Sequence, residues 1–454
     1  MNATENVDVV VIGMGPGGED VALKLADAGL TVVGIEPSLV GGECANWGCV
    51  PTKMMIRASQ LLAEARRIPG MAGSAQVQSD WSPVAARIRD DATNDWNDHV
   101  AVERFEGKGG RFIRGSGILV APDIVKVGEQ QFRASKAIVI ATGSSPAIPP
   151  IPGLNGTPYW TNHDVVEATV LPRSLIILGG GAIGSELAQM LARFGVAITI
   201  VEAAPRLLPV EEPEAGDLLE SVFRNEGITV IAGIPATRIE HRDNQFQVHL
   251  ADGRQLDGER MLVATGRRVD LKAFGAEVLG IDATARALLV DERLRVAERV
   301  WAVGDVTGKG AFTHIASYQA GIVVADILDK QHHSADYRAI PRVTFTDPEV
   351  GSVGLSQQAA IDAGFDVAIG HTLVPSTTRG WIHKSGNEGF IKLVVDRKRG
   401  TLLGATSMGP SGGEVLGLLT LAVHTSIPIE RLRSMIYAYP TFHRGIEDAL
   451  RDIS

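Results

Sequence analysis

The sequence predicts an α/β fold in which parallel strands alternate with helices. Its 454 residues exceed what one hydrophobic core holds, since single cores stop growing near roughly 250–300 residues, so about three domains are expected. A segment that reads as strand, glycine-rich turn, helix and strand occurs twice, which is typical of βαβ units. Three more apolar runs each end in a glycine-containing turn and fit the same plan.

The composition is that of an ordinary globular protein, with 45% hydrophobic and 21% charged residues. A formal charge of −10 without a dense run of Lys and Arg argues against nucleic acid or a membrane as a partner. No basic residue precedes Lys24, so the positive region of a signal peptide is missing. Apolar stretches fall short of the roughly 20 residues of a membrane span. We therefore expect a cytoplasmic enzyme that acts on a small molecule.

The segment DVVVIGMGPGGEDVALKLADAGLTVVGIEP predicts the first dinucleotide site. Gly13 allows a tight turn, and Gly15 lets the backbone approach a pyrophosphate closely. Gly18 allows close packing of the helix on the strand. The pyrophosphate then lies at a helix N-terminus, which favours anions. Glu36 follows Gly18 by 18 residues, where a carboxylate can accept hydrogen bonds from ribose hydroxyls.

The segment SLIILGGGAIGSELAQMLARFGVAITIVEAAP repeats this pattern and predicts a second dinucleotide site. Gly179, Gly181 and Gly184 have the same spacing, and Glu202 again follows the last glycine by 18 residues. A 2′-phosphate would be repelled by Glu202, so this site should prefer NAD to NADP. Arg206 weakens that preference without cancelling it.

Three strand ends predict further parts of the nucleotide sites. KAIVIATGSSP and RMLVATGRRVD each run from an apolar strand into Ala-Thr-Gly, which places Thr142, Gly143 and Gly266 in turns, and VWAVGDVTG ends on Gly304 and Asp305. Together these ends predict one nucleotide domain that is interrupted by a second.

Cys44 and Cys49, in GGECANWGCVPTK, are the only cysteines in the chain. A metal half-site, an inert disulfide and a redox couple are the three alternatives. Zinc would need further ligands that no cysteine or histidine cluster supplies, and inert disulfides are rare in a reducing cytosol. We favour a redox pair and expect both sulfurs at the start of a helix, whose dipole lowers the pKa of a thiol.

These motifs together resemble the class I pyridine nucleotide-disulfide oxidoreductases, which include dihydrolipoamide dehydrogenase, glutathione reductase and mercuric reductase. The resemblance extends over essentially the whole chain through GGECANWGCVPTK, VGDVTGKGAFTHIASYQA, VTFTDPEVGSVGLS and GFIKLVVDRKRGTLLGATSMGP. It implies two Rossmann-like domains, for FAD and NAD(P), and an α+β C-terminal dimerisation domain that completes the active site of a partner subunit. The implied ranges are 1–149 and 272–338 for FAD, 150–271 for NAD(P), and 339–454 for dimerisation.

The same resemblance implies an electron path and its residues. Electrons would pass from NADH, with NADPH as the alternative, through FAD to a Cys44–Cys49 disulfide. Cys49 would face the flavin, and Cys44 would exchange with the substrate. Lys53 occupies the position of the family's flavin-side lysine, and Glu186 that of its glutamate partner. Gly42 lies in the disulfide motif and counts among the cofactor-binding residues.

The C-terminal segment YAYPTFHRGIED departs from the family. Disulfide-reducing members carry a histidine where Tyr439 stands and a glutamate where Arg444 stands. A phenol is a poor base at neutral pH, and losing a matched acid/base typically costs about 10²–10⁴ in rate. His443 is a candidate substitute, although it lies four residues from the usual place, and an interface histidine is the alternative.

Three functions are therefore compared. The favoured function is a homodimeric FAD enzyme that reduces a disulfide or other small acceptor through Cys44 and Cys49, with Tyr439 in place of the histidine. A mercuric-reductase-like or quinone-reducing enzyme is the second, although the chain has no further cysteine pair to deliver mercury. A redox-sensing flavoprotein that acts on a protein partner is the third.

Overall fold

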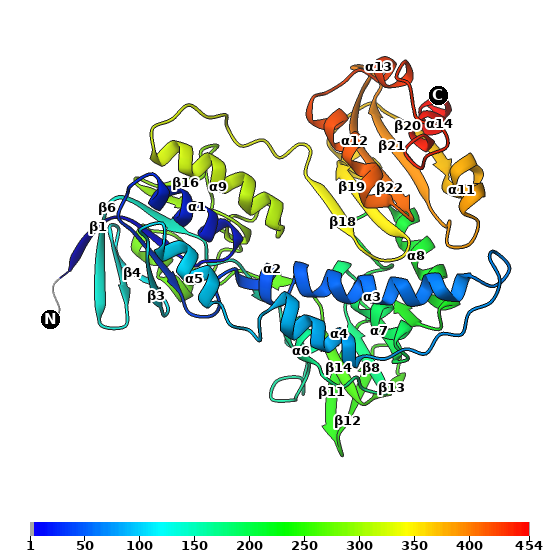
Figure 1. Ribbon diagram of the computed structural model, residues 1–454, viewed down its shortest axis with the longest axis horizontal. Helices are drawn as coiled ribbons and strands as arrows, with labels where there is room; N and C mark the ends of the chain where they lie inside the picture. Colours follow the sequence, from blue (N-terminus) through cyan, green and yellow to red (C-terminus); the bar gives the residue numbers. More distant parts are fainter. Residues whose placement is uncertain (1–3, 454) are drawn as a thin grey trace. The chain divides into compact units, whose positions relative to one another are not determined.

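The structure is a computed structural model that describes residues 4–453 (Figure 1). The described residues form two compact units. Each unit contains a largely parallel sheet with helices packed against it. Two helices, α3 (Cys49–Arg67) and α4 (Ser82–Arg87), begin in one unit and end in the other. The first unit comprises the described residues up to 52 with 85–147 and 267–337, and the second comprises 53–84, 148–266 and the described residues from 338 onward.

The first unit is built on an eight-stranded sheet whose central strands are parallel. Along β1, Val9 and Val11 belong to the apolar core on one face, and Val10 and Ile12 to the core on the other, because successive side chains of a strand alternate. The strand order is β16 (Arg295–Ala297), β17 (Val300–Ala302), β6 (Gln130–Ile140), β1 (Glu5–Ile12), β2 (Val32–Glu36) and β3 (Arg111–Arg114), while β4 (Ile118–Ala121) pairs with β5 (Ile124–Val127) and β5 with β6.

Both faces of this sheet are covered. Helices α1 (Pro16–Asp27) and α9 (Thr313–Ile327) lie side by side over one face (Figure 1), where Val21, Leu25 and Val323 are fully buried. The core on the other face includes Leu119, Val125 and Phe274, which come from β4, β5 and a 3₁₀ turn. The remaining elements of this unit are short: α2 (Gly42–Asn46), a π-helix (Ile88–Ala92), α5 (His99–Glu106), β7 (Ser145–Pro146), β15 (Arg267–Arg268) and 3₁₀ turns at Lys272–Phe274, Ala276–Leu279 and Asp305–Thr307.

The first part of the second unit contains a four-stranded parallel sheet and a three-stranded antiparallel sheet. Their apolar side chains form one core, in which Phe246 and Met261 are fully buried. The parallel order is β10 (Thr229–Ala232), β9 (Ala197–Glu202), β8 (Ser174–Leu178) and β14 (Arg260–Val263), the antiparallel strands are β11 (Ala236–Arg242), β12 (Gln245–Leu250) and β13 (Gln255–Gly258), and the helices are α6 (Asn162–Glu167), α7 (Ala182–Arg193) and α8 (Pro213–Asn225).

The C-terminal part of the second unit is a five-stranded antiparallel sheet. Helix α12 (Gly412–His424) packs on β19 and β22, and α14 (Gly445–Asp452) packs on β20 (Figure 1). The strand order is β18 (Pro341–Thr344), β19 (Glu349–Gly354), β22 (Thr401–Gly409), β21 (Phe390–Asp396) and β20 (Val367–Leu373), and the other helices are α10 (Gln357–Asp362), α11 (Thr378–His383), α13 (Ile429–Arg433) and a 3₁₀ turn at Val374–Ser376.

Two searches of the described chain give negative results. Among residues 4–453, no helix combines the length and the apolar character that crossing a bilayer requires. The same residues contain no cluster of three or more His, Cys, Asp or Glu side chains arranged to hold a metal ion.

Candidate active site

The first glycine loop joins β1 to α1 and has a shape that only glycine permits. Gly13 has φ +96°, and a Cβ atom there would lie 2.4 Å from the carbonyl oxygen of Ala141. A Cβ atom on Gly18 would lie 2.0 Å from the carbonyl oxygen of Gly13, so any larger residue would push the helix off the strand. Around Gly15, the N-cap of α1, no described atom lies within 4 Å of the Cβ position. The open helix start fits the pyrophosphate of FAD.

Glu36 ends β2 and supports this loop through its buried carboxylate. The backbone N–H groups of Met14 and Ser38 each donate to it at 2.9 Å. A carboxylate has about four acceptor sites, so about two remain for ribose hydroxyls. Ribose binding by Glu36 stays a prediction, and holding the glycine loop is a task that the sequence did not reveal.

The second glycine loop, between β8 and α7, repeats this geometry. Gly179 has φ +106°, and its Cβ atom would lie 2.4 Å from the carbonyl oxygen of Ala264. A Cβ atom on Gly184 would lie 2.0 Å from the carbonyl oxygen of Gly179. Gly181, the N-cap of α7, is again open within 4 Å, so this loop also has room for a pyrophosphate.

Glu202 holds the second loop as Glu36 holds the first. Its carboxylate accepts hydrogen bonds from the backbone N–H groups of Gly180 and Ala204, both at 2.6 Å. The guanidinium of Arg206, which could bind a 2′-phosphate, lies 3.4 Å from the carboxylate of Asp217 instead. This pairing is in keeping with the predicted preference for NAD.

The turns after β6 and β17 meet at a hydrogen-bonded cluster. The predicted residues Thr142 and Gly143 follow β6, and the hydroxyl of the next residue, Ser144, donates to Asp305 Oδ2 at 2.5 Å. Arg267 donates through Nε to Ser144 Oγ at 2.7 Å and through Nη2 to the carbonyl oxygen of Ser144 at 2.5 Å. Asp305 is therefore held in a fixed position beside the end of β17.

Arg267 also joins this cluster to the cysteine loop, and sequence reasoning did not identify it. It directly follows Gly266, an exposed turn residue with φ +115°. Its Nη1 lies 3.4 Å from Glu43 Oε2, and its Nε lies 3.8 Å from Asp305 Oδ2. The available signal was Glu43, a carboxylate in the cysteine loop with which a cationic side chain can pair.

The cysteine loop packs directly on the first glycine loop. A Cβ atom on Gly42, which has φ +56°, would lie 2.9 Å from the Cα of Gly15. Cys49 begins α3, and its Sγ lies 3.4 Å from the Oγ1 of Thr313 at the start of α9. Cys44 is half-buried in α2, and Cys49 is exposed. The pair therefore lies within the part of the fold that surrounds the predicted FAD pyrophosphate.

The prediction that both cysteines begin one helix is wrong. Only Cys49 begins a helix, because α2 ends at its C-cap Trp47 and leaves Cys44 inside a separate five-residue helix. Hydrogen bonding with Cys49 and burial raise the pKa of the Cys44 thiol. The dipole argument made for both sulfurs fails for Cys44.

Lys53 and Glu186 form an ion pair in the second unit, with 2.8 Å between Nζ and Oε2. Glu186 is 6% exposed, and its Oε1 accepts the backbone N–H of Phe345 at 2.8 Å. The Lys53 ammonium also lies 4.8 Å from the centre of the Phe345 ring. The pair is thus fixed in place, while its role beside the flavin stays a prediction.

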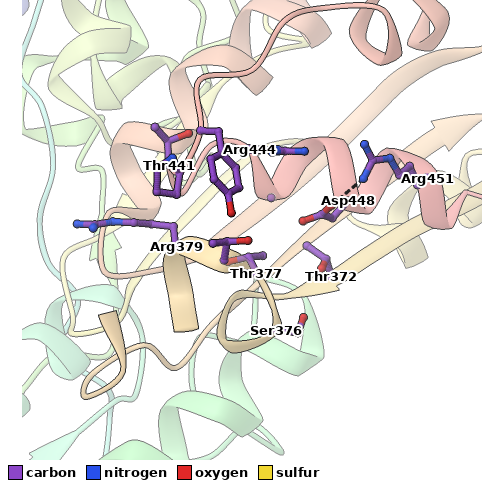
Figure 2. A pocket seen from close by; sticks show the side chains of 12 residues that line it. Thr372, Ser376, Thr377, Arg379, Thr441, Arg444, Asp448 and Arg451 are labelled. Carbon is purple, nitrogen blue, oxygen red and sulfur yellow. Dashed lines mark hydrogen bonds and ion pairs between the residues drawn. The ribbon is translucent and has the colours of Figure 1, made fainter. Parts of the chain in front are cut away.

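The segment that contains Tyr439 brings Arg444, and not His443, against the phenol. The Arg444 guanidinium lies 4.9 Å from the centre of the Tyr439 ring, and its Nε lies 3.0 Å from Glu447. The His443 ring instead lies 6.2 Å from that of Tyr437. Tyr439 is 64% exposed, and with Arg444 it lines a cavity of about 370 Å³ (Figure 2). A catalytic role for His443 stays a prediction.

Comparison with known families accounts for most of the chain. Residues 7–320 match the pyridine nucleotide-disulphide oxidoreductase family, and residues 340–450 match the dimerisation domain of the same family. The predicted fold class and the resemblance are both confirmed by these matches.

Individual relatives agree with the family match. The chain is 33% identical over 462 residues to a dihydrolipoyl dehydrogenase from Chlorobaculum tepidum, covering 98% of this chain and 96% of the relative. It is 29% identical over 459 residues to a mercuric reductase from Staphylococcus aureus, covering 98% and 82%. The solved Cu(II) complex of the HOCl-induced flavoprotein disulfide reductase RclA from Escherichia coli superposes with a TM-score of 0.87 at 29% identity, covering 99% of each chain. The chain therefore belongs to the pyridine nucleotide-disulphide oxidoreductases and is an FAD- and NAD(P)H-dependent oxidoreductase.

Proposed function

We propose that this enzyme reduces a small acceptor with electrons from NAD(P)H, preferring NADH, and that Cys44 and Cys49 hand over those electrons. The observation that carries the proposal is the packing of Gly42, in the cysteine loop, on Gly15 of the first glycine loop. That packing supports a position of the cysteines beside the cofactor. FAD would be held by residues 1–149 and 272–338, NAD(P) by 150–271, and a second subunit by 339–454.

The reaction balances with a disulfide as the acceptor. When bound, FAD supplies a route for two electrons from NAD(P)H to the Cys44–Cys49 disulfide, which takes up two protons and becomes two thiols. The Cys44 sulfur attacks one acceptor sulfur, forms a mixed disulfide and releases the first product thiol with one proton. The Cys49 sulfur then attacks Cys44, restores the protein disulfide and releases the second product thiol with the other proton.

Proton transfer is the step that this chain must manage without the histidine and glutamate of the family's disulfide-reducing members. Because the pKa of Cys44 is raised, its proton has to be moved as the sulfur attacks. In the homodimer that the dimerisation domain indicates, Tyr439 of the partner chain would accept and pass on this proton through its phenol oxygen. A Tyr439→Phe variant should lower disulfide turnover by about 10²-fold.

A metal ion is the second candidate acceptor. The exposed Tyr439 in place of a histidine favours it, because a thiophilic metal ion bound by the two sulfurs accepts electrons without a proton being handed to a leaving thiol. The relatives named mercuric reductase and RclA, solved as a Cu(II) complex, also support it. Tyr439→Phe separates the two, since metal-ion turnover should be unchanged in this variant.

The proposal is tested by trapping the thiols and by turnover. The purified enzyme is treated without oxygen with NADH or buffer and then unfolded in urea with iodoacetamide, so that every free thiol reacts, and Cys44 and Cys49 are examined by mass spectrometry. Alkylation of both only after NADH supports the proposal. Quinone turnover that survives in Cys49→Ser, with no disulfide or metal-ion turnover in the parent enzyme, would instead establish a quinone reductase. If both cysteines are alkylated only after NADH but no small acceptor is turned over, the protein would instead be a redox sensor.

A further inference from the structure

The cavity beside Tyr439 has a built, cationic lining. It has a volume of about 370 Å³ and lies entirely within the C-terminal part of the second unit. Its wall is formed by the end of β20, the turn that leads into α11, the start of α11, the segment around Tyr439, and one side of α14. Figure 2 shows the charged side chains Arg379, Arg444, Asp448 and Arg451 around it. Three guanidinium groups therefore face one carboxylate among the residues that line it.

The three arginines differ in how their charges are compensated. Arg444 pairs with Glu447, and Arg451 pairs with Glu447 and with Asp448 at 3.3 Å. Arg379 has no ion pair with any residue in the described chain 4–453, and its guanidinium lies 5.2 Å from the centre of the Phe442 ring. A half-buried arginine with a ring on one side presents its remaining N–H donors to a ligand.

Arginine in place of glutamate at position 444 adds to the positive charge of the cavity. A glutamate, which the family's disulfide-reducing members have here, would repel an anion in the cavity, whereas Arg444, although paired with Glu447, attracts one. The guanidinium of Arg444 lies over the Tyr439 ring at 4.9 Å, so its charge is held beside the phenol. The attraction by Arg444 and the absence of a repelling glutamate both favour an anion in the cavity, as is usual where a site selects ligands by charge.

We propose that this cavity binds a carboxylate of the electron acceptor, and that the acceptor is therefore a small organic anion. The planar guanidinium of Arg379 would bind the carboxylate through two parallel hydrogen bonds. This inference rests on the proposed function, because it is Tyr439 from the partner chain that brings the cavity to the cysteines. It adds a substrate class that neither the family nor the nucleotide motifs assign.

The inference is tested with two acceptors that differ in charge alone. These are 5,5′-dithiobis(2-nitrobenzoate) and its neutral diamide, 5,5′-dithiobis(2-nitrobenzamide), each reduced by NADH to two aryl thiols. In Arg379→Gln, kcat/KM for the benzoate should fall about tenfold, which corresponds to about 1.4 kcal/mol, while kcat/KM for the benzamide changes less than about twofold. Arg379→Lys should recover part of the loss, because it restores the charge but not the planar fork.

The controls keep the outcome interpretable. Arg431→Gln removes an exposed arginine of α13 that does not line the cavity and should leave both acceptors unchanged. Unchanged FAD content and melting temperature establish that each variant is folded. An equal fall for both acceptors in Arg379→Gln, or no fall for either, would overturn the inference. If Cys49→Ser retains turnover of both acceptors, the proposed function fails, whatever Arg379 does.

Discussion

The two glycine loops of this enzyme are nearly superimposable in their local geometry, although they lie in different units. Gly13 and Gly179 have φ of +96° and +106°, and a Cβ atom on either would lie 2.4 Å from a carbonyl oxygen of a neighbouring strand end. Glu36 and Glu202 each accept two backbone hydrogen bonds, one of them from the glycine loop itself. The same spacing of residues has produced the same loop geometry twice.

The loops differ in what the rest of the chain packs beside them. Gly42, from the cysteine loop, approaches the first loop at Gly15, and Arg267 ties that cysteine loop to Asp305. The segment that approaches the second loop is different: Leu208 donates its backbone N–H to the carbonyl oxygen of Gly180 at 2.9 Å, as Gly41 donates to that of Met14 at 2.8 Å in the first loop. The motif thus sets the shape of each loop, and the segment that packs on it sets which side chains lie nearby.

The largest expected effects come from filling the third glycine of each loop. Gly18→Ala places a Cβ atom 2.0 Å from a backbone oxygen, and such overpacking typically costs about 1–3 kcal/mol. We expect the affinity of purified Gly18→Ala for FAD to be about 10- to 100-fold lower than that of the parent enzyme. Flavin absorbance after dialysis measures this loss.

The matched variant Gly184→Ala meets the same 2.0 Å contact in the second loop. It should keep its FAD and raise the KM for NADH by about 10-fold or more in a steady-state assay. Loss of FAD from both variants, or from neither, would contradict the assignment of one cofactor to each loop.

A smaller effect is expected from the acid of the second loop. Glu202→Gln removes the charge that repels a 2′-phosphate, so the ratio of kcat/KM for NADH over NADPH should fall about tenfold. Glu36→Gln is the matched control and should leave this ratio unchanged. A parent enzyme that already prefers NADPH would refute the role given to Glu202.

Breaking the link that Arg267 makes beside the first loop should give a still smaller effect. Arg267→Met removes hydrogen bonds to Ser144 and the contacts with Glu43 and Asp305. At about 1 kcal/mol for a net hydrogen bond, FAD affinity should fall about fivefold. Equilibrium dialysis measures this, and unchanged affinity would show that the cluster does not support the FAD site.

The smallest effect near neutral pH is expected outside both loops, at Tyr437. Burial raises the pKa of Tyr437 to about 12, and its hydroxyl donates to the carbonyl oxygen of Leu432 at 3.1 Å. The folded state thus favours the protonated phenol. The resulting contribution to the free energy of unfolding is complete below pH 10 and is lost as the pH rises from 10 through 12. In urea titrations the parent should lose stability over this range more steeply than Tyr437→Phe. Parallel curves would contradict the raised pKa.

Sequence reasoning was strongest where one short segment contains every partner in an interaction. The strands, the glycine loops and the family could be inferred in this way. It failed for Cys44, because the break between α2 and α3 at Trp47 depends on how the cysteine loop packs. It also missed Arg267, whose partner Glu43 is 224 positions away, and Arg379, which shares a cavity with Tyr439.

The sequence by itself determined the two dinucleotide loops, since the requirements for positive φ, an open helix start and a distant acid are local and are met by residue type. Only the tertiary structure decided that Gly42 lies on Gly15, that Cys44 and Cys49 lie in separate helices, and that Arg444 rather than His443 lies over Tyr439. Those features depend on packing and on charges brought together by chain folding. Neither is encoded in the spacing of residues along the chain.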